Sequence, residues 1–240
     1  AEDGIRDDVE SRGLGDVYKR QVDAIVLVPI DSKALVQPAV EAVRKGIPVI
    51  NIDIQLDAQL LEQAGVEVAF VGPDNFAAAY EVGKLLGKKL RNEDKVAIIE
   101  GLAVADNARQ RKRGFIKAIE EKGLRLVASE PADWETEKAA EVFQAMWMRY
   151  PDLKAVYCSN DAMALGVLQQ MQEKKCYLPV VGFDNDAVMK EFLSTGKLVA
   201  TADIFSSQMA VRGIEFALDV LEGRIENRGV HSTAYEIIKQ

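Results

Sequence analysis

Polar side chains that accept hydrogen bonds follow four apolar, strand-like runs of this sequence. The runs AIVLVPID, IPVINID, LKAVYCSND and LPVVGFD end at Asp31, at Asp53, at Asn160 with Asp161, and at Asp184. A helix-like stretch follows each run, so the four ends should meet at the carboxyl edge of a parallel sheet, where open α/β sheets bind ligands. Carboxylate and amide oxygens accept hydrogen from hydroxyl groups. Because no obvious nucleophile accompanies them, the pattern indicates a site that holds a hydroxyl-rich solute without transforming it.

Strand and helix patterns alternate along the chain from Val22 onward. The pattern predicts strands at residues 24–29, 48–52, 66–71, 95–99, 125–130, 155–159, 179–183 and 198–202. It predicts helices at residues 32–45, 75–90, 105–122, 136–150, 161–174, 187–194 and 206–222. Such alternation is typical of an α/β protein with parallel sheets and helices on both faces.

The composition and charge limit the kinds of partner. The chain has 240 residues, of which 48% are hydrophobic and 28% charged, with a formal net charge of −8, as expected of a soluble globular protein. Nucleic acid is not expected as a direct partner, because a phosphate backbone requires a basic surface. No apolar run approaches the roughly 18–20 residues of a membrane-spanning helix.

An enzymatic function is not expected from the motifs. The sequence has no G-x-S-x-G elbow, no G-x-x-x-x-G-K-[ST] loop and no histidine pair for a metal, and its one histidine is His231. We therefore expect no catalytic residues, no metal and no cofactor.

Several polar residues have two interpretations. Asp31 and Asp161 stand where helix N-caps belong, and we favour the capping role for both. Asp184 has the same alternative, but there we favour contact with a ligand. Trp134 follows a strand in a loop, which favours a binding surface over ordinary packing. Of the basic run at residues 109–113, only Arg111 is a candidate for a pocket.

The first 21 residues differ from the rest and have no apolar period. The segments AEDGIRD and SRGLGDVYKRQ resemble, in the correct order, the translation of sequencing-adapter DNA. We expect residues 1–21 to be an adapter-derived artefact without structure. On this interpretation the natural protein begins upstream of Val22.

From Val22 to Gln240 the chain resembles periplasmic sugar-binding proteins of the ribose-binding type. The motifs that carry the resemblance are DAIVLVPIDS, IPVINID, ARQRKRGF, PADW, SNDAMALG, VVGFD, GKLVATAD and the final LEGR, in this order. The family shares its type I periplasmic-binding-protein fold with the effector domains of lactose-repressor-like regulators. The resemblance implies two Rossmann-like parallel-sheet lobes joined by three crossing segments, with the ligand trapped between the lobes.

The resemblance also implies where the lobes divide. The crossings fall near residues 73–74, 203–204 and 233. The amino-terminal lobe is then 22–73 plus 204–232, and the carboxyl-terminal lobe is 74–203 plus 233–240. The first lobe would lack roughly two strands and two helices, so we expect it to show an exposed sheet edge, an open apolar face and a tendency to aggregate.

By the same resemblance, one interlobe pocket is formed by Asp53, Arg111, Trp134, Asn160, Phe183 and Asp184. Asp53 accepts sugar hydroxyls from the first lobe, and Asn160 and Asp184 are polar ligands of the second. Arg111 donates in a fixed fork to ring and hydroxyl oxygens, while Trp134 packs on the C–H face of the sugar. Phe183 is implied to be a neighbouring wall residue.

Two positions depart from the pattern of ribose binders. Ile54 stands where those proteins carry an arginine, and Ile204 stands where they carry a glutamine. Each lost polar partner costs a buried hydroxyl about 1–3 kcal/mol. We therefore expect a ligand whose edge facing Ile54 and Ile204 is less polar than that of ribose.

The resulting hypothesis is a solute-binding receptor of an ABC-type sugar importer. Its partners would be a sugar-like solute and the membrane subunits of the importer, and its location periplasmic or extracellular and lipid-anchored. The alternative is the effector domain of a lactose-repressor-like transcription regulator. An export signal upstream would favour the receptor, and a helix-turn-helix upstream would favour the regulator.

Overall fold

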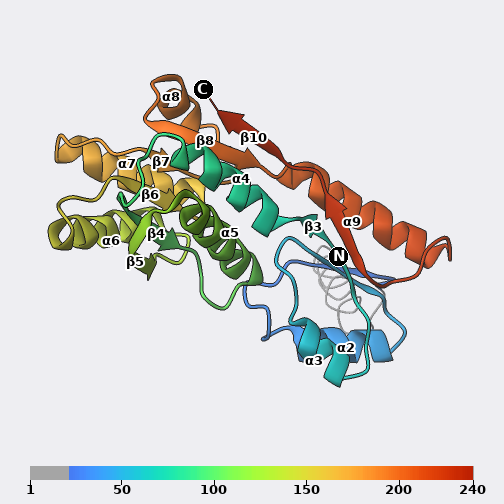
Figure 1. Ribbon diagram of the computed structural model, residues 1–240. Coiled ribbons are helices and arrows are strands. Elements are labelled where there is room, and N and C mark those ends of the chain that lie inside the picture. Colours follow the sequence, from blue (N-terminus) through green and yellow to red (C-terminus); the bar gives the residue numbers. More distant parts are fainter. Residues whose placement is uncertain (1–21, 240) are drawn as a thin grey trace, which may run out of the picture.

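The computed structural model describes residues 22–239, and Figure 1 shows two sheets with helices packed on them. The adapter interpretation of residues 1–21 lies outside the described residues. Within the described range, no helix combines the length and apolar character needed to cross a membrane.

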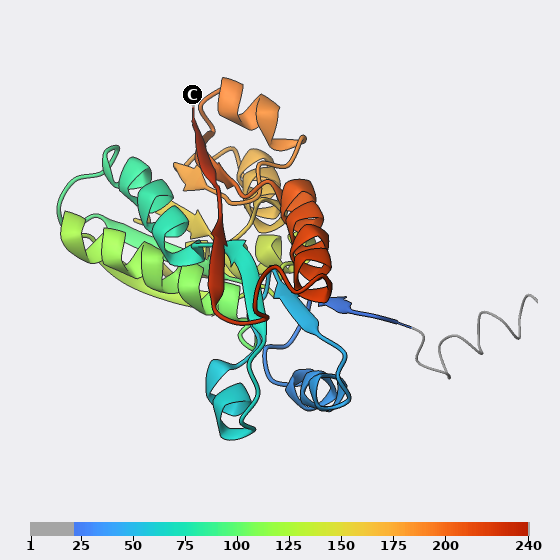
Figure 2. The ribbon, with the colours of Figure 1, turned by 90° about the vertical axis from the view of Figure 1, so that its right-hand side faces the viewer.

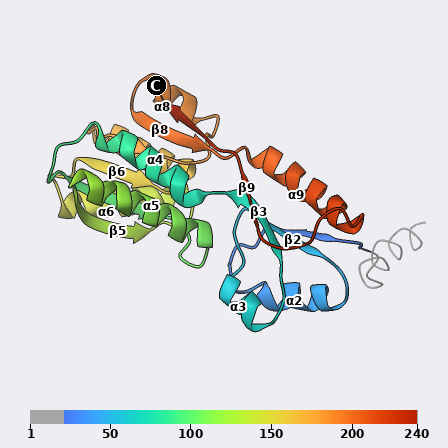
Figure 3. The same ribbon diagram turned by 45° about the vertical axis from the view of Figure 1, so that its right-hand side comes forward.

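The first sheet has four parallel strands in the order β1-β2-β3-β9. These strands are β1 (Ile25–Leu27), β2 (Val49–Ile52), β3 (Ala69–Pro73) and β9 (Val230–Thr233). Helices α2 (Val36–Arg44) and α3 (Ala58–Gln63) cover one face, and α9 (Ser206–Leu221) covers the other (Figure 3). All four residues of β2 are buried, because Val49 packs toward α2 and Ile50 and Ile52 pack toward α9.

The second sheet has six strands in the order β10-β8-β7-β6-β4-β5, and only β10 runs antiparallel to its neighbour. Its strands are β4 (Lys95–Glu100), β5 (Arg125–Pro131), β6 (Ala155–Cys158), β7 (Val180–Val181), β8 (Leu198–Asp203) and β10 (Glu236–Lys239). Its helices are α4 (Asn75–Gly87), α5 (Asp106–Lys122), α6 (Thr136–Arg149), α7 (Asp161–Glu173) and α8 (Met189–Ser194). Both faces are buried, since Ile98 packs in one core cluster and Ile99 in the other. This is the expected arrangement of a parallel sheet covered on both sides.

Helices α4 and α5 pack closely because glycine lies at their contact. A Cβ added at Gly114 of α5 would lie 2.5 Å from the carbonyl oxygen of Phe76 in α4. This close contact matters for the site, since α5 carries Arg111.

The chain passes between the two sheets three times. It leaves the first sheet after β3 to begin α4, returns after β8 to begin α9, and leaves again after β9 to begin β10. The predicted α/β class with two parallel-sheet lobes is confirmed.

Some element boundaries differ from those predicted. Helix α2 begins at Val36 rather than at residue 32, because the Asp31 carboxylate first accepts from the N–H groups of Lys33 and Ala34 in a turn. Helix α3 was not predicted; its Asp57 N-cap accepts from the N–H of Leu60. The strand predicted at residues 66–71 begins only at Ala69.

An apolar stripe on α9 faces away from the sheet. Val211, Ile214, Leu218 and Leu221 are 54%, 54%, 50% and 45% exposed. Their spacing of three and four residues places them on one face of the helix. Figure 2 shows α9 at the surface of the molecule.

The stripe leads to a first prediction. Replacing Leu218 with Glu should reduce binding of an apolar dye and self-association, and should change the free energy of unfolding by less than about 0.5 kcal/mol. Replacing the adjacent Ala217, which packs against β2 and β3, with Glu should lower that free energy by about 2 kcal/mol or more. Dye fluorescence, sedimentation and urea denaturation measure these effects. Equal destabilisation by both variants would contradict the exposed position of the stripe.

Candidate functional site

A cleft of about 360 Å³ lies where the two sheets meet the crossing segments. Seven of the eight predicted site residues line it, namely Asp53, Ile54, Arg111, Trp134, Asn160, Asp184 and Ile204. They come from the ends of β2, β5, β6, β7 and β8 and from α5. Residues far apart in the sequence therefore converge on one cavity.

Three of the lining residues have left-handed backbone conformations. The φ angles of Asp53, Trp134 and Asp184 are 63°, 70° and 109°. Such angles are uncommon for residues other than glycine and persist only where the surrounding structure holds them. Asp53 directly follows β2, and Trp134 and Asp184 lie three residues after the ends of β5 and β7. At these positions the left-handed conformation directs the side chain into the cleft.

Arg111 is the most constrained side chain of the cleft. It is 3% exposed, its Nε donates to Asn75 Oδ1 at 2.9 Å, and its Nη1 donates to the Ser159 carbonyl at 2.9 Å. Nη1 also lies 3.4 Å from Asp184 Oδ1. Among the described residues nothing accepts from Nη2. The guanidinium is therefore oriented before any ligand arrives, with one nitrogen left to donate.

Phe183 does not line the cleft. Its side chain is fully buried, and its ring lies 3.7 Å from the Arg111 guanidinium carbon. The ring packs against the arginine that lines the cleft, and its role as a neighbouring wall residue stays a prediction.

The carboxylates of the cleft have raised pKa values. Burial raises the pKa of Asp53, although Arg111 opposes the shift. Burial also raises the pKa of Asp184 to about 6, against the same arginine. At neutral pH, Asp184 is mostly ionised, so it can accept hydrogen bonds from hydroxyl groups.

Trp134 provides a ring surface on one side of the cleft. The side chain is half-buried, and a Cβ added at Gly101 would lie 2.0 Å from its Cη2 atom. Only glycine at the end of β4 therefore allows this ring position. The Arg111 guanidinium carbon lies 5.6 Å from the ring centroid.

Asn160, rather than Asp161, caps helix α7. The Asn160 side-chain oxygen accepts from the Met163 N–H at 2.9 Å. The prediction that Asp161 is the cap is wrong, because its buried carboxylate bonds to Thr201 and Asp186 instead. The Asn160 amide nitrogen makes no hydrogen bond among the described residues, so it can donate to a ligand.

Four lining residues were not predicted: Asn107, Asp186, Ser206 and Met209. Asn107 is 5% exposed, and its Oδ1 has no partner among the described residues. It lies four residues before Arg111, on the same face of α5. That spacing is the signal that could have identified it.

Two lining residues of the cleft are isoleucines. Ile54 packs with Ala105, the residue before α5, and with Ala108 of α5, whereas Ile204 is 3% exposed and belongs to another core cluster. Neither side chain offers a hydrogen-bond donor or acceptor to a ligand.

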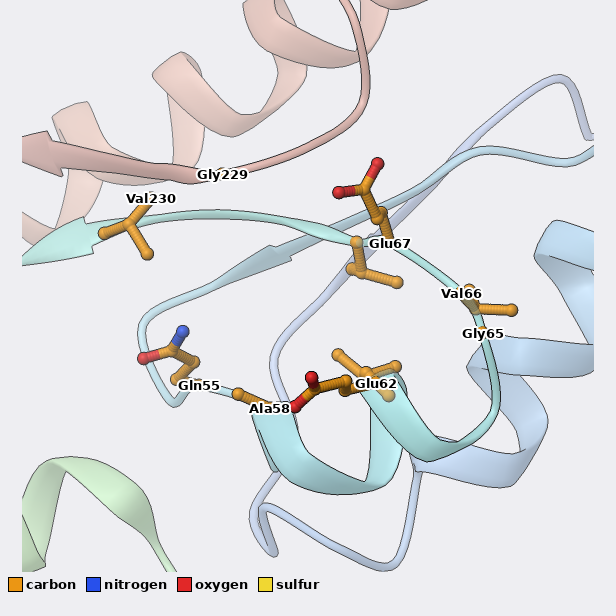
Figure 4. Close-up of a pocket in the computed structure, with 10 residues that line it drawn as sticks. Gln55, Ala58, Glu62, Gly65, Val66, Glu67, Gly229 and Val230 are labelled. Atoms are coloured by element: carbon orange, nitrogen blue, oxygen red, sulfur yellow. The ribbon is translucent and has the colours of Figure 1, made fainter.

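A second pocket, of about 420 Å³, lies between α3 and the strand ends of the first sheet. Figure 4 shows Gln55, Glu62 and Glu67 around its opening, with Val66 and Val230 beside them. Its lining includes no aromatic ring and no cationic side chain. It therefore lacks the guanidinium group and the ring surface that the interlobe cleft combines.

Metal binding has no support in residues 22–239, where no three His, Cys, Asp or Glu side chains are grouped to hold an ion.

The raised pKa values lead to a second prediction. Burial raises the pKa of Asp161 to about 7 and that of Asp184 to about 6, from an ordinary value of 3.8. Between these values the folded protein binds more protons than the unfolded chain, so stability falls as pH rises. The free energy of unfolding of the ligand-free protein should therefore increase as the pH is lowered from about 8 to about 6. Urea denaturation at several pH values measures it, and a decrease over this range would contradict the assignment.

Comparisons with known proteins agree with this geometry. The model of the family described as periplasmic binding protein domain matches residues 12–225. A D-ribose/D-allose-binding protein of Pseudomonas aeruginosa is 39% identical, over 98% of this chain and 76% of its own. The D-allose-binding periplasmic protein of Escherichia coli is 34% identical, over 85% of this chain and 67% of its own.

Solved structures show the same similarity. An ABC transporter solute-binding protein from Burkholderia multivorans has a TM-score of 0.89 and 39% identity, covering 95% of this chain and 81% of its own. A periplasmic solute-binding protein from Actinobacillus succinogenes with bound D-allose has a TM-score of 0.86 and 32% identity, covering 95% of this chain and 82% of its own.

Proposed function

Because the chain belongs to the periplasmic binding protein family, we propose that it is the solute-binding receptor of an ABC-type sugar importer. It takes up a monosaccharide between its two lobes and delivers it to the membrane subunits. The convergence of Asp53, Arg111, Trp134, Asn160 and Asp184 on one cleft supports this proposal. The similarity to importer receptors favours it over the effector domain of a transcription regulator and over an enzyme.

The cleft residues suit the parts of a sugar. Asp53 and Asp184 accept hydroxyl hydrogens, whereas Arg111 Nη2 and the Asn160 amide donate to sugar oxygens. Trp134 covers a C–H face of the ring. The set therefore offers acceptors, donors and a ring surface to a sugar, and the similar proteins are named for sugar binding.

The two isoleucines of the cleft restrict the ligand. A sugar edge facing Ile54 and Ile204 loses hydration without gaining a hydrogen bond. Similar proteins include a binder named for D-ribose and D-allose and, at 27% identity, a structure with bound D-fucose. We propose an aldose of this size whose edge at Ile54 and Ile204 carries fewer hydroxyl groups than that of ribose.

Lobe closure is the proposed mechanism. The lobes are 22–73 plus 204–232 and 74–203 plus 233–240, which move about crossings near residues 73–74, 203–204 and 233. Ligand contacts from both lobes exist together only in the closed state, so binding shifts the population toward it. The receptor would act in the periplasm, or outside the cell on a lipid anchor.

Calorimetric titration with D-ribose, D-allose and D-fucose tests the function and the specificity separately. Binding of at least one sugar, lost in Asp53→Asn and retained in Asp57→Asn outside the cleft, is expected. Absence of binding to any sugar would refute the receptor. Ribose as the tightest ligand would refute only the proposal about Ile54 and Ile204.

A further inference from the structure

Asp161 is a buried carboxylate just behind the cleft. Its side chain is 0% exposed, and the cleft lining does not include it. Its Oδ1 accepts from the Thr201 hydroxyl at 2.9 Å, and its Oδ2 accepts from the Asp186 N–H at 2.9 Å. A Cβ at Gly182 would lie 1.9 Å from Oδ1, so the carboxylate fills a space that glycine leaves open.

The segment that Asp161 holds is the strained loop of the sugar site. Asp184 and Asn185 have φ angles of 109° and 59°, and Asp184 and Asp186 both line the cleft. The Asp161 backbone N–H also donates to the Phe183 carbonyl at 2.7 Å. Asp161 therefore fixes the loop on both sides of its left-handed residues.

The same network reaches the second crossing segment. Thr201 Oγ1 accepts from the Asn185 N–H at 3.2 Å while its own hydrogen goes to Asp161. The Asn185 side-chain amide donates to Asp203 Oδ2 at 2.9 Å. Asp203 Oδ1 in turn accepts from the Phe205 backbone N–H at 2.8 Å. Loop and crossing thus share one chain of hydrogen bonds.

We propose that Asp161 is a positioning residue of the sugar site: its ionised carboxylate holds the loop at residues 184–186 so that Asp184 faces the ligand. The inference rests on the proposed function for its effect on affinity. It does not require Asp161 to touch the sugar.

Ionisation of Asp161 matters because both of its partners donate. A protonated carboxyl would itself donate to Thr201 Oγ1, so the Thr201 hydroxyl would have to turn and its own hydrogen would lose its acceptor. The charged groups that interact with Asp161 are Asp184 and Asp186 of the loop and Arg111 of α5. The titratable thiol of Cys158 on β6 is also close enough to interact with it. Burial raises the pKa of Asp161 to about 7 and that of Asp184 to about 6. The Asp161→Asn variant is what distinguishes the two titrations, since only that of Asp184 remains in it.

The test compares Asp161→Asn and Asp161→Ala with the parent protein by calorimetry over a range of pH. Asp161→Asn keeps the size and one acceptor, so sugar affinity should fall by up to about tenfold above pH 8, and Asp161→Ala should lose more. In the parent, affinity should decline as pH falls through about 7, and in Asp161→Asn the midpoint should move to about 6. Asp57→Asn, the same change at the N-cap of α3, is the matched control and should alter neither quantity.

A second measurement does not depend on a sugar. In the ligand-free protein, the amide NMR signals of Asn185 and Asp186 should titrate near pH 7 in the parent and lose this step in Asp161→Asn. If no sugar binds but this step is present, the receptor function fails and the positioning role stands. If Asp161→Asn does not fold, Thr201→Val, which removes one bond to Asp161 and one to Asn185, should lower affinity. Parent-like affinity and pH midpoint in folded Asp161→Asn would overturn the proposal.

Discussion

An Arg111→Met variant should bind sugar about 10- to 150-fold more weakly than the parent protein, because a hydrogen bond from a charged group contributes about 1.5–3 kcal/mol. The guanidinium lies 3.4 Å from Asp184 and is held by Asn75 and Ser159. Its removal takes away the Nη2 donor that is left for the ligand, and it leaves the buried acceptors of Asn75, Ser159 and Asp184 without this donor. Titration calorimetry measures the affinity, and thermal unfolding should show a lower midpoint as well.

Two further variants separate charge from geometry. Arg111→Lys retains the positive charge but loses the planar fork and the stacking on Phe183, so most of the affinity should still be lost. Arg109→Met makes the same chemical change two positions earlier, where the side chain is 43% exposed and pairs with Asp106 at the surface. It should bind sugar normally, since such pairs contribute about 1 kcal/mol or less. Affinity within tenfold of the parent in Arg111→Met would contradict the central role of this residue.

The sequence was sufficient to predict the class of fold and the edge at which the site lies. Buried parallel strands produce continuous apolar runs, and β2 and β6 are buried at every position. Polar residues after such strands must gather at one sheet edge. The choice of Arg111 from a basic run came from the resemblance, and its burial gives the physical reason.

Short or exposed elements could not be predicted. Strand β9 has an exposed, mixed sequence, Val230–Thr233, and exists because it pairs with β3 along four residues. Such pairing depends on residues more than 150 positions away in the chain, so no local pattern indicates it. Helix α3 is only six residues long and depends on its Asp57 cap.

Side-chain direction in the loops was the other limit. The backbone angles of Asp184 and Asn185 decide that Asp184 faces the cleft and Phe183 faces the core. Residue type and spacing do not contain these angles. For the same reason the roles of Asn160 and Asp161 at the start of α7 could not be distinguished from the pair Asn-Asp alone.

Asn107→Ala should weaken sugar binding by about tenfold to a hundredfold without destabilising the ligand-free protein. The Asn107 side chain is 5% exposed and lines the cleft, yet its Oδ1 has no partner among the described residues. A buried acceptor without a donor costs about 1–3 kcal/mol, and a sugar hydroxyl would supply the missing donor. Removal of the amide should therefore lower affinity while the free energy of unfolding stays equal or rises.

Asn75→Ala provides the matched comparison, because Asn75 is also buried but both its Oδ1 and its Nδ2 have partners. Its Oδ1 accepts from Arg111 Nε at 2.9 Å, and its Nδ2 donates to the Pro73 carbonyl at 3.4 Å. Its loss should lower both affinity and the free energy of unfolding. Calorimetry measures the sugar affinity of each variant, and urea denaturation measures its free energy of unfolding. Both variants should bind more weakly, but only Asn75→Ala should be less stable than the parent. A clear loss of stability in Asn107→Ala would show that its amide serves the fold rather than the ligand.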